Sequence, residues 1–171
     1  MLAAGWLCMA CGGGRSHAGA TPASMQVSGV DSVVQGTVAV KGADPFAQVI
    51  VSPTAVVAAR EVAVVGPLRA ELGALSGAEV RVRGRAVSNG QPVPRRAIAV
   101  TSYEIVSING EKPIVGELVA REGDLWLGGE RLSGVPAELH QAVGAKLWVV
   151  GRRANGELLV LSYGIIVRPP K

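Results

Sequence analysis

Two stretches of this chain repeat each other, and the repeat restricts the possible folds more than any other feature. Residues 70–84 read AELGALSGAEVRVRG, and residues 137–151 read AELHQAVGAKLWVVG. A match of this length in a fixed frame predicts two tandem copies of one structural unit. At a constant offset of 67, the identical pairs are Ala70/Ala137, Glu71/Glu138, Leu72/Leu139, Gly77/Gly144, Ala78/Ala145, Val82/Val149 and Gly84/Gly151.

The repeat extends beyond this block, with changes in spacing. Downstream, Asn89-Gly90 matches Asn155-Gly156, and Ser102-Tyr103 matches Ser162-Tyr163. The offset therefore falls from 67 to 66 and then to 60. We interpret this as two copies whose loops differ in length while their strands and helices persist. Upstream, Val34 and Gly36 loosely resemble Val115-Gly116.

The second copy shows the clearer order of elements. Short runs rich in β-branched and other apolar residues alternate with turn signals, of which Asn155-Gly156 is typical of a tight hairpin. Pro136 followed by an acidic residue favours the start of a helix, with Gly144 at its end. We expect strands over 114–120, 124–127, 130–132, 145–151 and 157–167, a helix over 136–143, and the matching helix of the first copy over 67–75.

This β-β-β-α-β-β order resembles the OB-fold, a small five-stranded barrel. The resemblance covers residues 114–167 well and 33–110 less well. It implies an all-β chain with two tandem OB-like five-stranded barrels, each with one short helix between its third and fourth strands. We expect domains over 33–112 and 113–171. The first copy has an Ala- and Val-rich insertion over 49–66, which we interpret as two strands broken at Pro53, or as a strand followed by a short helix.

The first eleven residues have features of an export signal. They are apolar and uncharged, and Leu7-Cys8-Met9-Ala10-Cys11 resembles a bacterial lipobox, which implies lipidation of Cys11. Residues 12–32 would be a flexible tether. The basic start of such a signal is missing, so we expect Lys or Arg upstream of Met1. The resemblance implies an exported protein on the periplasmic face of the cell envelope, with the outer membrane as the expected anchor site. The alternatives are a short apolar tail with two incidental cysteines, or a disordered N-terminus of a cytosolic protein.

Few residues of the body are suited to catalysis. It has no cysteine, and His140 is its one histidine, with no neighbouring ligand type for a metal. No nucleophile motif or phosphate-binding loop is present. Glu71 and Glu138 are expected at helix starts, while Tyr103 and Tyr163 are expected to cover one end of each barrel. We expect a protein that is not an enzyme and that has no cofactor or metal.

The first copy contains a stretch in which every second residue is an arginine. Arg81, Arg83 and Arg85 alternate with apolar residues and glycine, so a strand would place all three on one face. Arg95 and Arg96 follow in the loop before the last strand, which borders the ligand groove of OB-folds. Residues 34–112 contain nine basic and six acidic residues, whereas residues 114–167 contain five and six. This face is either solvated, or binds an anionic partner, or binds nucleic acid.

These features lead to two hypotheses on function. The first is a non-catalytic binding or scaffold module of the cell envelope, lipid-anchored to a membrane, with an anionic envelope component or an envelope protein as partner. The second is an OB-fold protein that binds single-stranded nucleic acid through the arginines of the first copy. Copy one offers only Phe46 and Tyr103 for base stacking, so the first hypothesis is favoured.

The repeat also resembles exported bacterial domains of this barrel type that have no settled activity. It therefore implies a fold and a location, but no chemistry. Neither the ligand nor the oligomeric state follows from these features.

Overall fold

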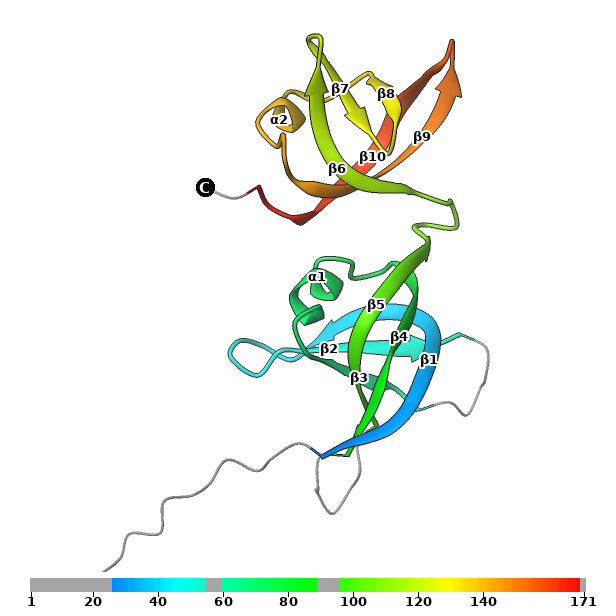
Figure 1. The fold of residues 1–171 in the computed structure, drawn as a ribbon, viewed down its shortest axis with the longest axis vertical. Coiled ribbons are helices and arrows are strands. Elements are labelled where there is room, and N and C mark those ends of the chain that lie inside the picture. The colour runs from blue at the N-terminus through cyan, green and yellow to red at the C-terminus, as the bar shows by residue number, and fades with distance from the viewer. Residues whose placement is uncertain (1–25, 55–59, 89–95, 170–171) are drawn as a thin grey trace, which may run out of the picture.

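A computed structural model describes residues 26–54, 60–88 and 96–169 of the chain (Figure 1). The predicted lipidation site Cys11, most of the predicted tether, and Arg95 lie outside the described residues. The described part is mostly β, as predicted, with two five-stranded sheets and a short helix in each half.

The first sheet closes on itself. Its strand order is β1-β2-β3-β5-β4, and β4 pairs with β1 as well as with β5, which makes a closed barrel. The pair β3–β5 is parallel and the other pairs are antiparallel. Its elements are β1 (Gln26–Lys41), β2 (Gln48–Pro53), β3 (Val62–Val65), α1 (Arg69–Gly73), β4 (Glu79–Ser88) and β5 (Ala97–Ser107).

The second sheet has the same strand order in its own numbering, and it too closes into a barrel. Here β9 pairs with both β6 and β10, and β8–β10 is the parallel pair. Its elements are β6 (Ile114–Arg121), β7 (Asp124–Leu127), β8 (Glu130–Ser133), α2 (Ala137–His140), β9 (Lys146–Ala154) and β10 (Glu157–Val167).

Residues of the repeat occupy matching places in the two barrels. The amide of Gly77 donates to the carbonyl of Val38 at 2.9 Å, and the amide of Gly144 donates to the carbonyl of Leu118 at 2.8 Å. Both glycines have positive φ, +89° and +86°, which side chains rarely adopt. The same turn therefore connects helix to barrel in each copy.

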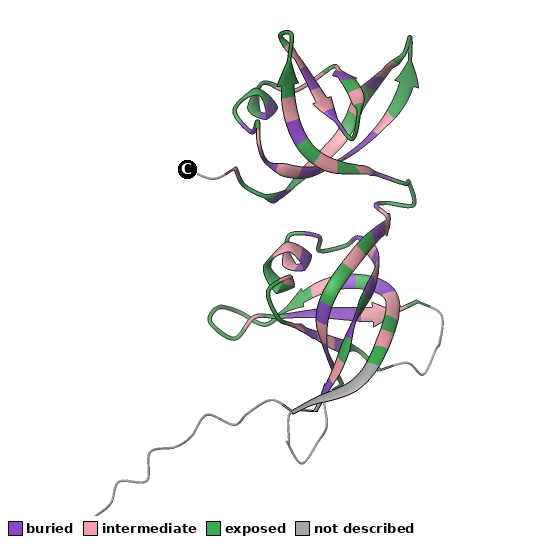
Figure 2. Ribbon diagram, in the orientation of Figure 1, coloured by how far each residue is buried: buried purple, intermediate pink, exposed green. Residues whose placement is uncertain are grey.

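The two cores follow the alternation of the strands. Buried positions alternate with more exposed ones along the strands of both copies (Figure 2). The inward residues of the repeat belong to two separate apolar clusters. Positions with 0% exposure in both copies are Leu72/Leu139, Val80/Leu147 and Val82/Val149.

Several elements differ from their predicted bounds. The helices are shorter than predicted, because they end at Gly73 and His140. Beyond these residues, three-residue turns such as Leu75 N–H to Leu72 O and Ala142 N–H to Leu139 O continue the chain. The fourth strand of the second copy does not end at Gly151, since β9 continues to Ala154. The insertion over 49–66 contains most of β2 and all of β3, which confirms the interpretation as two strands.

The two barrels contact each other through an apolar surface. Val150 of β9 and Ile166 of β10 are buried, and both belong to the cluster of the first barrel. Trp148, which is partly buried, packs against the same cluster. In Figure 1, α1 lies at the end of the first barrel that faces the second. Through this contact, side chains on the outside of the second barrel extend the core of the first barrel at its helix-capped end.

Candidate functional site

The three arginines of β4 lie on one outward face, as the alternation predicted. Val80 and Val82 are fully buried, whereas Arg81 is half-buried and Arg83 and Arg85 are exposed. The neighbouring strands β1 and β5 set the partners of each arginine through their register. The cross-strand neighbours are Gln35 and Glu104 for Arg81, Val33 and Ser102 for Arg83, and Asp31 and Ala99 for Arg85.

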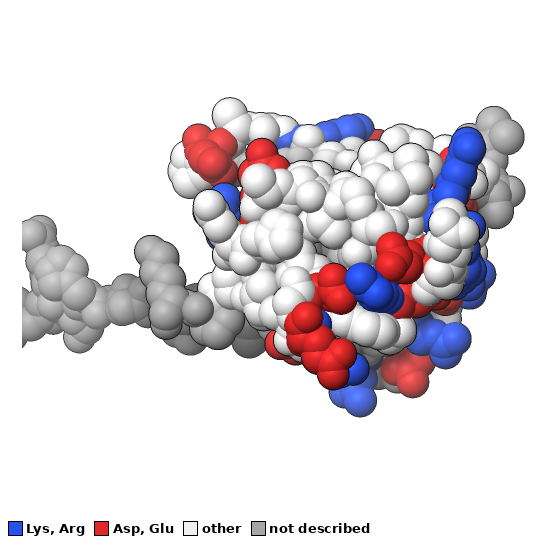
Figure 3. All heavy atoms as spheres, turned by 90° about the horizontal axis from the view of Figure 1, so that it is seen from above, with Lys and Arg blue, Asp and Glu red and all other residues white. Residues whose placement is uncertain are grey.

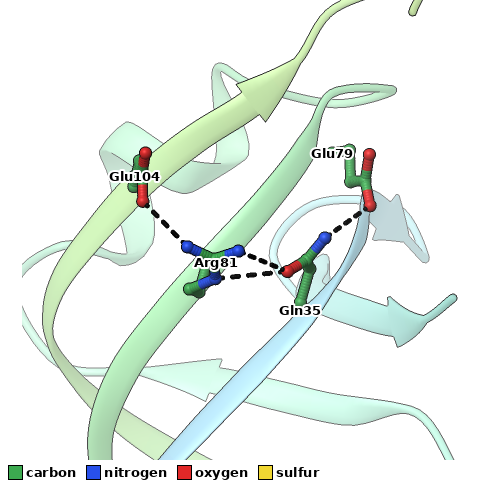
Figure 4. A network of polar contacts seen from close by, with 4 residues as sticks. All are labelled: Gln35, Glu79, Arg81 and Glu104. Atoms are coloured by element: carbon green, nitrogen blue, oxygen red, sulfur yellow. Dashed lines mark hydrogen bonds and ion pairs between the residues drawn. The ribbon is translucent and has the colours of Figure 1, made fainter. Parts of the chain in front are cut away.

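Arg81 is the centre of a polar network on this face (Figure 4). Its Nε and Nη2 donate to Oε1 of Gln35 at 3.2 and 2.9 Å, and its Nη1 lies 3.3 Å from Oε2 of Glu104. The side-chain nitrogen Nε2 of Gln35 donates in turn to Oε1 of Glu79 at 2.9 Å. The guanidinium is therefore held between β1 and β5, with a carboxylate at each end of the network.

The carboxylates reduce the basic character of the face. Besides Glu79 and Glu104, Asp31 lies 3.9 Å from Arg85. Among the described residues, only Arg83 of the three arginines has no ion pair. Three acidic side chains thus accompany three basic ones, so the face carries little net charge.

Among the described residues, no contact links Arg96 to the arginines of β4. It is exposed, directly before β5, and its carbonyl accepts the amide of Ala63 at 2.9 Å. Arg95 lies outside the described residues.

A second polar cluster, which the sequence did not predict, lies between the two barrels. Glu71 of α1 accepts hydrogen bonds at its Oε2 from the hydroxyl of Tyr103 and from Nζ of Lys146, both at 2.6 Å. Nζ of Lys146 also lies 3.0 Å from the Tyr103 hydroxyl and 4.9 Å from the centre of the Tyr103 ring. Glu71 and Tyr103 belong to the first barrel and Lys146 to the second, so the cluster joins them.

The charges in this cluster shift one another's titration. The hydrogen bonds from Lys146 and Tyr103 lower the pKa of Glu71 below its ordinary value of 4.5. Burial and the hydrogen bond to Glu71 raise the pKa of Tyr103. Partial burial disfavours the charge of Lys146, but its hydrogen bonds to Glu71 and Tyr103 outweigh this and raise its pKa. The ion pair is therefore the stable state at neutral pH.

One difference between the two copies of the repeat indicates this cluster. Lys146 stands where the first copy has Glu79, so the two copies carry opposite charges at that position. Glu71 lies in the first turn of α1, as predicted for it. Its matched residue Glu138 lies in the first turn of α2 and is exposed. The two copies therefore differ in charge and in contacts at these positions.

The outer face of β7 and β8 carries a third group of polar side chains. Arg131 lies 3.0 Å from Asp124 and 3.4 Å from Glu157. The guanidinium of Arg121 lies 6.0 Å from the centre of the Trp126 ring. The indole Nε1 of Trp126 is buried without a hydrogen-bond partner among the described residues. This face combines an aromatic ring with paired charges.

Charges at the outer end of the second barrel are likewise mixed. Arg153 donates through Nε to both carboxylate oxygens of Glu130, at 3.1 and 3.0 Å, and through Nη2 as well. The hydrogen bond from Arg153 lowers the pKa of Glu130. Seen from this end, basic and acidic side chains lie beside one another around a broad uncharged surface (Figure 3).

No three His, Cys, Asp or Glu side chains of residues 26–54, 60–88 and 96–169 are grouped to hold a metal ion. Within the same ranges, none of the helices is long and apolar enough to cross a membrane. His140, at the end of α2, is exposed.

Comparison with protein-family models, with curated proteins and with solved structures finds no significant match to this chain.

Proposed function

We propose that this chain is a non-catalytic binding or scaffold module of the cell envelope, built from two OB-like barrels and lipid-anchored at Cys11. Both barrels have the strand order of first, second, third, fifth and fourth strand, with a helix between the third and fourth strands. This order supports the OB-like assignment. The lipobox-like segment and the Gly-rich stretch after it support the anchor.

The observation that carries the scaffold role is the contact between the barrels. It combines the buried residues Val150 and Ile166 with the Glu71–Lys146 ion pair at 2.6 Å. Burial of apolar side chains favours association of the two barrels, and the ion pair favours one relative orientation of them. Together they give the barrels one preferred arrangement. The outer strand faces are then presented to partners at a fixed spacing.

The anchor is tested by fractionation of cells that express the full-length protein. We expect the membrane fraction to contain the wild-type protein and the Cys8→Ala variant, because only Cys11 follows the small residue of the lipobox-like segment. The Cys11→Ala variant should lose its membrane association. Wild-type protein that remains soluble, or a Cys11→Ala variant that stays with the membrane, would contradict the anchor.

The alternative, binding of single-stranded nucleic acid by the first barrel, is disfavoured by the charge pattern of β4. Polyanion binding depends on the number of phosphates that unpaired Lys and Arg neutralise. Here Glu104 and Asp31 lie beside two of the three arginines. We expect the protein to leave a heparin column at low salt. Elution only at high salt, lost on Arg83→Ser, would favour the alternative.

A further inference from the structure

The two barrels differ at one strand edge, although their strand order is the same. In the first barrel, β4 pairs with β1 as far as Ser88, which lies opposite Gln26. In the second barrel, β9 pairs with β6 only from Lys146 to Val149. Beyond Val149, β9 continues to Ala154 with β10 on one side and no strand of the described residues on the other.

The chain itself explains why β6 starts late. Gly36 and Gly116 lie opposite the matched residues Val80 and Leu147, so they hold the same position in the two barrels. Counting back from them, Pro113 stands where the first barrel has Val33. Proline has no N–H and cannot donate to the ladder. The preceding residues instead form a turn, closed by a bridge between Ile108 and Glu111.

A pocket of about 470 Å³ lies beside this unpaired edge. Its volume is within the usual range of ligand pockets. Alternate residues of β9 line it, namely Val149, Gly151 and Arg153. The full lining consists of Lys112, Pro113, Ile114, Val149, Gly151, Arg153 and Leu158.

The first barrel shows what covers the same place when a strand is present. Ser32 of β1 lies opposite Gly84, the residue that matches Gly151. Asp31 lies opposite Arg85, which matches Arg152. A strand with a small residue and an acidic residue thus completes the barrel there.

We propose that the free edge of β9 (residues 150–154) binds an extended peptide of a partner protein by strand addition. Main-chain hydrogen bonds to the edge would give affinity, and alternate side chains of the peptide would enter the pocket. The five residues of the edge span about 17 Å, enough for a short strand. Lys112 and Arg152 flank the edge as exposed cations, whereas the charge of Arg153 is already paired with Glu130. The peptide that fits is therefore apolar, with acidic residues that face Lys112 and Arg152.

The proposal concerns a different surface from the arginine face of β4, and it does not depend on the lipid anchor. Its probe is a labelled synthetic peptide with the sequence of residues 26–34, QVSGVDSVV, which includes the strand that covers the matching edge of the first barrel. We expect saturable binding of this peptide to the full chain, measured by fluorescence anisotropy. Hydrogen exchange should show new protection of those amides of residues 150–154 that point away from β10.

Matched variants distinguish this site from unspecific binding. Ile114→Trp fills the pocket and should weaken binding at least tenfold, whereas Val115→Trp, on the neighbouring exposed residue, should leave it unchanged. Lys112→Glu should weaken binding several-fold, and Arg60→Glu, on an exposed residue of the first barrel, should not. Circular dichroism checks that each variant is folded, and Lys112→Glu provides the test if Ile114→Trp does not fold.

Three results would overturn the proposal. One is no binding at peptide concentrations up to about 1 mM, which would show that the arginines protect the edge as charges protect edge strands elsewhere. Another is binding that neither Ile114→Trp nor Lys112→Glu weakens. The third is amide protection confined to the first barrel, which would place the peptide on a different edge.

Discussion

At the scale of single residues, Gly84 and Gly151 show why the repeat retains certain glycines. A Cβ at Gly84 would lie 2.1 Å from the carbonyl oxygen of Ala99, and one at Gly151 would lie 2.3 Å from that of Leu159. Neither glycine has a positive φ that would explain its presence. Both lie next to an irregularity in the pairing with the following strand. The requirement is close approach of two backbones in mid-strand, and the predicted end of the second copy's fourth strand at Gly151 is wrong.

We therefore expect Gly84→Ala and Gly151→Ala to destabilise the protein by similar amounts, about 1–3 kcal/mol each, because the strands must separate to admit a methyl group. Gly73→Ala is the control, since its Cβ would meet no backbone atom and only one side-chain atom, Cγ2 of Val49, at 3.3 Å. Urea denaturation measures all three. A loss at only one of the two strand glycines would show that the copies differ in structure at this point.

At the scale of elements, β4 has one face of buried apolar side chains and one face of charged side chains. The arginines on the charged face differ in the number of contacts that they make. Arg81 makes hydrogen bonds to Gln35 and an ion pair with Glu104, while Arg83 has neither an ion pair nor a side-chain hydrogen bond among the described residues. The strand alternation predicted the shared face. It did not predict the partners, because these come from β1 and β5, which are distant in sequence.

Because Arg81 and Arg83 differ in their contacts, their substitution by serine should change the free energy of unfolding by different amounts. Arg81→Ser should lower the free energy of unfolding by about 0.5–1 kcal/mol, as expected for a partly exposed ion pair with additional hydrogen bonds. Arg83→Ser should change it by less than about 0.5 kcal/mol, because no specific contact is lost. Chemical denaturation at low salt resolves the two. Equal effects would mean that the network around Arg81 contributes nothing in solution.

At the scale of the whole molecule, the contact between the barrels depends on the charge of Glu71. Its pKa is lower in the folded protein than its ordinary value of 4.5, owing to Lys146 and Tyr103. A carboxyl with a lowered pKa stabilises the folded state fully above its unfolded pKa, and this contribution is lost as the pH falls through the folded pKa. The barrels should therefore be held together most firmly at neutral pH and less so in acid.

Glu71→Gln should lower the thermal midpoint at pH 7, by an amount that corresponds to about 1 kcal/mol or less because the pair is partly exposed. The difference from wild type should shrink as the pH falls from 4.5 through the lower folded pKa of Glu71, since the wild-type carboxyl is then neutral too. Glu138→Gln, at the matched and exposed position of the second copy, should have no such pH-dependent effect. A deficit of Glu71→Gln that persists unchanged at pH 2 would contradict this role.

The sequence by itself determined the mostly β character of the described residues and the approximate positions of their strands and helices. These features depend on local patterns, namely the period of two in Val80 and Val82, turn glycines such as Gly77 and Gly144, and the Asn155-Gly156 hairpin, and each of these acts over a few residues. Only the tertiary structure decided the partners of Arg81, the Glu71–Tyr103–Lys146 cluster and the pocket beside β9. Each of these depends on contacts between residues far apart in the chain, which are set by strand pairing and by the packing of one barrel on the other rather than by local sequence pattern.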